Sequence, residues 1–157
     1  MTKLEKGMPA PDFELLDAEG NKWWLSALRG QKVILYFYPA DDTPGCTKEA
    51  CDFRDSKDDF ESAGFVVLGV SPQEAESHAA FARSHRLKFP LLVDEDLSVA
   101  ERYGTTAQEE RSYKDIAIKT RRSTFVIDED GNLIEALYDV NAREHVGDLV
   151  RQFARTG

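Results

Sequence analysis

The sequence contains few of the residues that build disulfide scaffolds, metal centres or membrane spans. Only two of its 157 residues are cysteines and three are histidines. Two cysteines are too few for a fold held together by disulfides. No apolar run approaches the length of a membrane-spanning helix. We therefore expect a chain that is long enough to fold around an ordinary hydrophobic core.

An excess of basic charge is also absent, because 20 Lys and Arg residues face 29 Asp and Glu residues for a formal net charge of -9. Nucleic acids and anionic membranes attract basic surfaces, so we expect neither as a partner. Residues 1–6, MTKLEK, lack the apolar segment of a signal peptide, which favours a cytoplasmic location. Repeats and low-complexity linkers are missing, so residues 1–157 are predicted to form a single domain.

Two motifs of redox and metal proteins are missing as well. No Cys-x-x-Cys occurs, which weakens an interpretation as a disulfide reductase or isomerase. His78, His85 and His145 fall on predicted helices without cysteines or carboxylates at metal-ligand spacing. We interpret them as solvated histidines and predict no metal site.

The most informative segment that is present runs from Pro39 to Cys51, PADDTPGCTKEAC. It follows the apolar run Val33–Tyr38, which predicts a central strand covered on both faces. Pro39 ends that strand. Thr43 is a good N-cap and Pro44 suits the first helical position, so a helix is expected to begin there.

Cys46 then falls at the third position of this helix. Unpaired backbone N–H groups and the positive end of the helix dipole favour a thiolate there and lower the thiol pKa. Gly45 keeps side-chain bulk away from the sulfur. The inward helical stripe comprises Cys46, Ala50, Phe53 and Phe60. Cys51 lies off this stripe, so the two sulfurs have different environments. Cys46 is predicted to be a nucleophile; the alternative is a cysteine packed as a small hydrophobe.

The remaining segments alternate between strand and helix patterns and predict an α/β fold. Hairpins are expected at 13–25 and 124–138, strands at 65–70 and 91–93, and helices at 71–85, 97–103 and 141–153. The helix at 71–85 is expected to start from a capping box, Ser71–Glu74, and the last helix from another, Asn141–Glu144.

The pattern Pro39-x-x-x-Thr43-x-x-Cys46 resembles the active-site signature of the peroxiredoxins. The longer run at residues 42–51, DTPGCTKEAC, is similar to the bacterioferritin-comigratory-protein subfamily, also called peroxiredoxin Q. The similarity extends from about Gly7 to the end of the chain. It implies a thioredoxin-like fold of the peroxiredoxin type, with a central mixed β-sheet flanked by helices and an N-terminal β-hairpin.

The resemblance also implies roles for individual residues. Cys46 corresponds to the peroxidatic cysteine and Cys51 to the resolving one. Thr43 is expected to hydrogen-bond the peroxide and the sulfur, and Pro39 to shield the pocket. Arg122 is expected to hold the thiolate, because arginine is a permanent cation with a planar fork of donors.

Two further positions match the family less distinctively. Glu49 is expected to orient Arg122, and Tyr38 to line the pocket. Adjacent residues of a strand point to opposite faces, so Arg121 is expected to be a surface charge while Arg122 reaches Cys46. Plainer roles also remain open: a surface cation for Arg122, a helix cap for Thr43 and a solvated first-turn carboxylate for Glu49.

The function implied is a thiol-dependent peroxidase for hydrogen peroxide and organic hydroperoxides. It would need no metal, haem or flavin, would form a Cys46–Cys51 disulfide within one chain, and would be recycled by thioredoxin or a similar dithiol protein. We expect a monomer. The alternatives are a redox sensor or thiol-disulfide exchange protein that uses the same cysteines, and a non-catalytic binding domain. The polar segment 105–111 departs from the family pattern, which leaves the surroundings of the pocket open.

Overall fold

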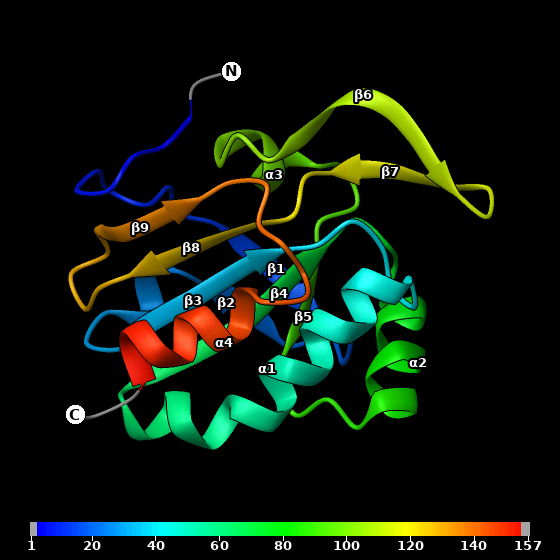
Figure 1. The fold of residues 1–157 in the computed structure, drawn as a ribbon. Coiled ribbons are helices and arrows are strands. Elements are labelled where there is room, and N and C mark those ends of the chain that lie inside the picture. Colours follow the sequence, from blue (N-terminus) through cyan, green and yellow to red (C-terminus); the bar gives the residue numbers. More distant parts are fainter. Residues whose placement is uncertain (1–2, 155–157) are drawn as a thin grey trace.

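The computed structural model describes residues 3–154, apart from the side chains of Gln108 and Glu110 (Figure 1). Residues 1–2 and 155–157, at the two ends of the predicted domain, lie outside the described residues. The elements in chain order are β1 (Glu14–Asp17), β2 (Lys22–Trp24), the 3-10 helix η1 (Ser26–Leu28), β3 (Lys32–Phe37), α1 (Pro44–Ser62), β4 (Phe65–Ser71), α2 (Ala75–His85), β5 (Leu91–Val93), α3 (Ser98–Arg102), β6 (Thr106–Tyr113), β7 (Ile116–Thr120), β8 (Ser123–Ile127), β9 (Leu133–Leu137), α4 (His145–Leu149) and the π-helical turn η2 (Val150–Ala154).

The main sheet is mixed and has seven strands in the order β2-β1-β5-β4-β3-β8-β9. Strand β3 lies inside it, parallel to β4 and antiparallel to β8. The β1–β2 hairpin joins the sheet through antiparallel pairing of β1 with β5. The predicted central mixed sheet and N-terminal hairpin are thereby confirmed.

Strand β3 separates two hydrophobic clusters. Its residues Val33, Leu35 and Phe37 pack on one side, together with residues of α3 and of the N-terminal segment. Ile34 and Tyr36 pack on the other, against α1, α2 and α4. Because both faces are covered, every residue from 33 to 37 is buried, as an unbroken apolar run predicts.

The predicted start of the second helix is wrong. Strand β4 continues through Ser71, which pairs with Val93 of β5, and α2 begins only at Ala75. The Ser71 hydroxyl donates to the side chain of Gln73 instead of capping a helix. Sheet pairing with a distant strand therefore overrides the local capping pattern.

The sequence pattern did not predict the hairpin formed by β6 and β7. It forms a separate two-stranded sheet that projects beyond the main sheet (Figure 1). Polar residues follow one another along β6, so the strand lacks the apolar alternation by which strands are recognised. The polar segment 105–111, which departs from the family pattern, therefore lies mostly in β6.

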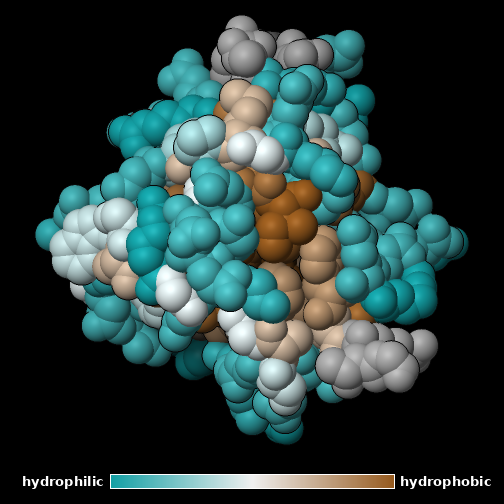
Figure 2. Space-filling view, turned by 90° about the vertical axis from the view of Figure 1, so that its left-hand side faces the viewer, coloured by the Kyte–Doolittle hydropathy of each residue, from teal (hydrophilic) through white to brown (hydrophobic). Residues whose placement is uncertain are grey.

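The last helix is shorter than expected. The Asn141 side chain accepts the backbone N–H of Arg143, as a capping residue does, but α4 begins at His145 and passes into η2 at Val150. The face at the left-hand side of Figure 1, where the β8–β9 turn and the end of the chain's last helical segment lie, exposes an apolar area among hydrophilic residues (Figure 2). Among the described residues, no helix is both long and apolar enough to cross a membrane.

Candidate active site

The predicted beginning of α1 is confirmed. Thr43 occupies the N-cap position with an extended backbone, Pro44 is the first helical residue, and Cys46 follows with only 1% of its surface exposed. The Thr43 side chain makes no capping hydrogen bond. Its hydroxyl donates to the Ala40 carbonyl at 2.9 Å and lies beside Cys46, whose pKa it lowers by hydrogen bonding. The hydroxyl of Thr43 is thus directed to the sulfur's surroundings instead of the helix end.

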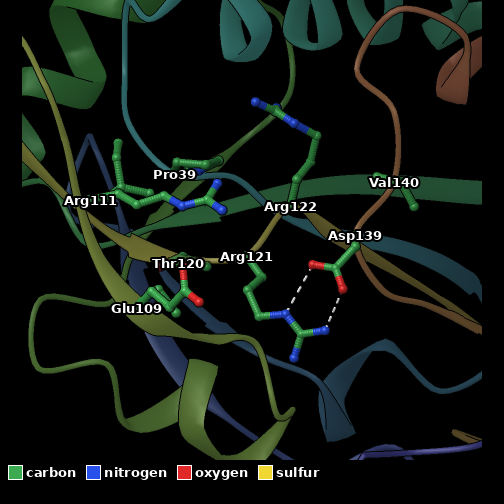
Figure 3. Close-up of a pocket in the computed structure, with 10 residues that line it drawn as sticks. Pro39, Glu109, Arg111, Thr120, Arg121, Arg122, Asp139 and Val140 are labelled. Carbon is green, nitrogen blue, oxygen red and sulfur yellow. Dashed lines mark hydrogen bonds and ion pairs between the residues drawn. The ribbon is translucent and has the colours of Figure 1, made fainter.

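Arg122 connects the sulfur to a buried carboxylate. Its Nη2 donates to Cys46 Sγ at 3.4 Å, and its Nη1 donates to Glu49 Oε1 at 2.8 Å. The preceding Arg121 turns away and donates from Nε to Asp139 at 3.0 Å (Figure 3). Of the two adjacent arginines, Arg122 therefore contacts Cys46. Both lie in the link between β7 and β8, outside either strand, so the strand alternation used in the sequence argument does not apply to them.

Burial and charge act in opposite directions on Cys46. Desolvation raises the pKa of the Cys46 thiol, and this outweighs the lowering by Arg122, Thr43 and the Ala40 backbone. The pKa lowering expected from the helix position is thus not supported. The groups that favour the thiolate are nevertheless in contact with the sulfur, so the thiolate, once formed, is stabilised where it is needed.

The Glu49–Arg122 pair is also shaped by burial. Glu49 is fully buried on α1, and desolvation raises its pKa to about 7 although Arg122 lowers it. Desolvation also lowers the pKa of Arg122, but Glu49 and Cys46 raise it more, so the guanidinium remains a cation. The interpretation of Glu49 as a solvated first-turn carboxylate is excluded by its complete burial.

Gly45 leaves room for the guanidinium. A Cβ atom on Gly45 would lie 2.8 Å from Arg122 Nη2, closer than real side chains approach. The sequence argument placed the free space beside the sulfur. The geometry assigns it to the arginine that contacts the sulfur.

Pro39 and Arg122 line one wall of a pocket of about 550 Å³ (Figure 3). The β6–β7 hairpin supplies the opposite wall, including Arg111. Tyr38 is not among the lining residues. It is fully buried, and its hydroxyl donates to Asp41 Oδ1 at 2.7 Å. Cys46 is not among the lining residues either, so this pocket does not test the expectation for Tyr38, and its place at the peroxide site stays a prediction.

Cys51 lies on α1 and is partly exposed, and both cysteines are free thiols. On a continuous helix, Cα atoms five residues apart are separated by about 8.7 Å. A disulfide requires roughly 4.4–6.8 Å. The helix must therefore unwind between Cys46 and Cys51 before their sulfurs can bond.

The histidines are a further correction. His78 is fully buried, with Nδ1 2.7 Å from Asp41 Oδ2, and only His85 is partly exposed among the three. His145 is also buried, with Nε2 2.7 Å from Thr124 Oγ1, and burial lowers its pKa to about 4. Helix position alone does not reveal burial, because the partners come from other elements.

Tyr36 is a neighbour of the site that the sequence interpretation missed. It is fully buried, and burial together with the charges of Glu49 and Cys46 raises its pKa. Among the described residues, its hydroxyl has no hydrogen-bond partner. Alternation along β3 could have indicated it, because it shares a strand face with Tyr38.

Known proteins resemble this chain along almost its whole length. The AhpC/TSA family matches residues 7–136. A putative peroxiredoxin of Mycobacterium tuberculosis is 47% identical over 153 residues, which cover 98% of this chain and 97% of the relative. Peroxiredoxin Bcp of Bacillus subtilis is 41% identical and covers 94% of both chains.

The fold agrees with these relatives. The crystal structure of peroxidoxin BcpB from Mycobacterium tuberculosis has a TM-score of 0.84 at 33% identity, covering 98% of this chain and 99% of that one. Its similarity confirms the thioredoxin-like peroxiredoxin fold. Proteins named peroxiredoxin are peroxidases, which makes this chain an oxidoreductase. The chain therefore belongs to the AhpC/TSA family and, within it, to the Bcp and peroxiredoxin Q group of peroxiredoxins.

Proposed function

We propose that this peroxiredoxin reduces hydrogen peroxide and organic hydroperoxides with Cys46 as the attacking thiolate. The sulfur attacks the terminal peroxide oxygen, the O–O bond breaks, and the remaining oxygen leaves as water or alcohol after taking a proton. Cys46 becomes a sulfenic acid. The contact of Arg122 Nη2 with Cys46 Sγ carries this proposal, since a cation there stabilises charge on both sulfur and departing oxygen.

Three neighbours support the attack. Thr43 would hydrogen-bond the bound peroxide, and Glu49 would hold Arg122 in position. Pro39 would shield the sulfur from water at the pocket wall. The pocket that Pro39 and Arg122 line also has apolar lining from Ile118 and Val140, which would suit the organic substituents of a hydroperoxide.

The cycle then closes through Cys51. Its thiol condenses with the Cys46 sulfenic acid, which forms the S–S bond and releases water. A dithiol protein, thioredoxin or one like it, reduces this disulfide by thiol-disulfide exchange and becomes a disulfide itself. The thiols of Cys46 and Cys51 are thereby restored. We propose that the enzyme acts as a monomer in the cytoplasm, where such dithiols are kept reduced.

Substitution of each cysteine tests this cycle. Cys46→Ser should abolish peroxide reduction, while Cys51→Ser should react once and accumulate a sulfenic acid that a dimedone-type probe traps. Peroxide-dependent NADPH oxidation with thioredoxin and its reductase should fall to background in both variants. Equal loss of the first oxidation in both would overturn the division of roles. Disulfide formation in the unaltered protein without turnover would favour a redox sensor instead.

A further inference from the structure

The loop between β3 and α1 is attached to α2 through a buried carboxylate. Asp41 is 5% exposed, and its carboxyl group makes three side-chain hydrogen bonds. The Tyr38 hydroxyl donates to Oδ1 at 2.7 Å, the Ser77 hydroxyl lies 2.8 Å from Oδ2, and His78 Nδ1 lies 2.7 Å from Oδ2. None of these contacts is used by the cycle proposed above.

His78 makes the attachment strong and directional. Its Nε2 lies 3.0 Å from the Leu92 carbonyl, which can only accept, so Nε2 carries a proton. One further proton then lies between Nδ1 and Asp41 Oδ2, on whichever atom it resides. The contact is a hydrogen bond in both cases, either between imidazolium and carboxylate or between neutral imidazole and carboxylic acid. It connects β5, α2 and the active-site loop.

The backbone of the same loop is held by Gln73. Its Oε1 accepts the Asp41 N–H at 3.1 Å, and its Nε2 donates to the Pro39 carbonyl at 3.2 Å. Residues 39–41 are thus fixed by both side-chain and backbone contacts. The loop that carries Pro39 towards the pocket has little freedom as long as these bonds remain.

Asp42 couples this attachment to the first turn of α1. Its φ is +60°, in the left-handed region that non-glycine residues seldom adopt. It lies between the fixed Asp41 and Thr43 at the N-cap. The contacts of Asp41 on one side and the N-cap position of Thr43 on the other hold Asp42 in this conformation. If the contacts of Asp41 are lost, Asp42 can relax to a more favourable φ, and Thr43 shifts with it.

We propose that Asp41 and His78 form a positioning pair that holds Pro39 and Thr43 around Cys46 and opposes the unwinding of α1. The pair touches neither peroxide nor the reacting sulfur. It acts by favouring the folded form, in which Cys46 attacks, over the unwound form, in which Cys46 and Cys51 bond. This inference rests on the proposed function, because it says that the pair favours peroxide attack by Cys46 over formation of the Cys46–Cys51 disulfide.

Two rate constants and one equilibrium test the pair. In Asp41→Ala, stopped-flow fluorescence should record peroxide attack slowed about tenfold or more, since small misplacements of reacting groups have effects of this size. The later condensation to disulfide should become faster. The reduction potential of the Cys46–Cys51 disulfide, set against dithiothreitol, should become more negative, because the reduced folded form has lost stabilising contacts.

Asp41→Asn provides the conservative rescue. Its side-chain oxygen can accept from Tyr38, and its amide can donate to His78 Nδ1 while Nε2 keeps its bond to Leu92. Both rate constants should return towards those of the unaltered protein. Ser77→Ala, which removes one donor from Asp41, should change both rate constants in the same directions by less, and it serves if Asp41→Ala does not fold.

Asp94→Ala is the matched control for lost stability. Asp94 is another buried aspartate, and its side chain accepts the N–H groups of Val99 and Ala100 at α3 instead of groups of α2 or of residues 39–43. It should lower the melting temperature without changing either rate constant. Unchanged kinetics and potential in Asp41→Ala, or equal changes in Asp94→Ala, would overturn the inference. If the unaltered protein does not react with peroxide, the proposed function fails, and the potential of a diamide-formed disulfide still tests the pair.

Discussion

Arg122 is a residue whose removal should affect both the ground state and the reaction. Arg122→Met removes the cation beside Cys46 and should raise the Cys46 pKa further. Peroxide attack should slow by more than the loss of thiolate explains, because contacts to the departing oxygen disappear as well. The thiolate absorbance as a function of pH and the attack rate constant at several pH values separate the two effects.

Arg121→Met is the internal comparison for this prediction. Arg121 is adjacent to Arg122 in the chain, but its guanidinium pairs with Asp139 instead of the sulfur. Its substitution should leave both the Cys46 pKa and the attack rate constant unchanged. Attack at the normal rate in Arg122→Met would contradict the role assigned to that guanidinium.

Gly45 gives a second prediction at the level of one side chain. In Gly45→Ala the new Cβ would meet Arg122 Nη2 at 2.8 Å, so the guanidinium must move from Cys46. We expect attack to slow about tenfold or more while the fold persists. Gly147→Ala is the matched control, because a Cβ there meets Arg151 at an ordinary 3.5 Å. Equal peroxide kinetics in the two variants would mean that Arg122 tolerates displacement.

Among the helices, α1 has to perform two incompatible tasks. It must be wound to place Cys46 beside Arg122, and unwound to let Cys46 reach Cys51. We expect amides from Cys46 to Phe53 to exchange faster with deuterium in the disulfide form than in the reduced form, with Val33–Phe37 nearly unaffected. Hydrogen exchange read by mass spectrometry on both redox forms measures this.

The same experiment on Cys51→Ser after one oxidation provides the control, because no disulfide can form within that chain. Its helix should keep the protection of the reduced form. Equal protection of α1 in both redox forms of the unaltered protein would mean that Cys51 is not the partner of Cys46.

Elements set by local chemistry were predictable from the sequence. The apolar run of β3 and the Thr43–Pro44 start of α1 are specified by residues next to each other in the chain. The start of α2 was not predictable in this way, because Ser71 pairs with Val93 of β5 and remains in β4. The polar hairpin β6–β7 was missed because it has no apolar alternation.

The assembly of the site depends on the topology of the whole sheet. Phe37 at the end of β3 pairs with Ser123 at the start of β8, so the segments that follow and precede them meet at one edge. This brings Cys46 and Arg122 together across 76 residues of sequence. Residue types and family resemblance indicated both partners, but the burial of His78 and His145 was not predictable, because distant elements cover them.

The stability of the whole molecule towards acid should depend on His145. Its pKa is lowered from 6.5 to about 4, mainly by burial, with a smaller lowering by the charge of Arg122 and an opposing effect of Asp148. The unfolded chain therefore takes up a proton below pH 6.5 that the folded protein accepts only near pH 4. The resulting stability is complete above pH 6.5 and is lost as the pH falls towards 4, to an extent on the order of 2–3 kcal/mol.

Glu49 works against this trend. Its folded pKa of about 7 is raised, so its contribution is complete below its unfolded value of 4.5 and is lost as the pH rises through 7. The contribution of His145 is therefore measured as the difference in acid loss of stability between the unaltered chain and a His145 variant, because Glu49 is present in both. Urea unfolding of reduced protein at pH 7 and at pH 4.5 should show a smaller acid loss in His145→Gln than in the unaltered chain. His85→Gln, at a partly exposed histidine of α2, is the control and should keep the original loss. An identical acid loss in all three proteins would mean that His145 is protonated in the folded state at pH 4.5.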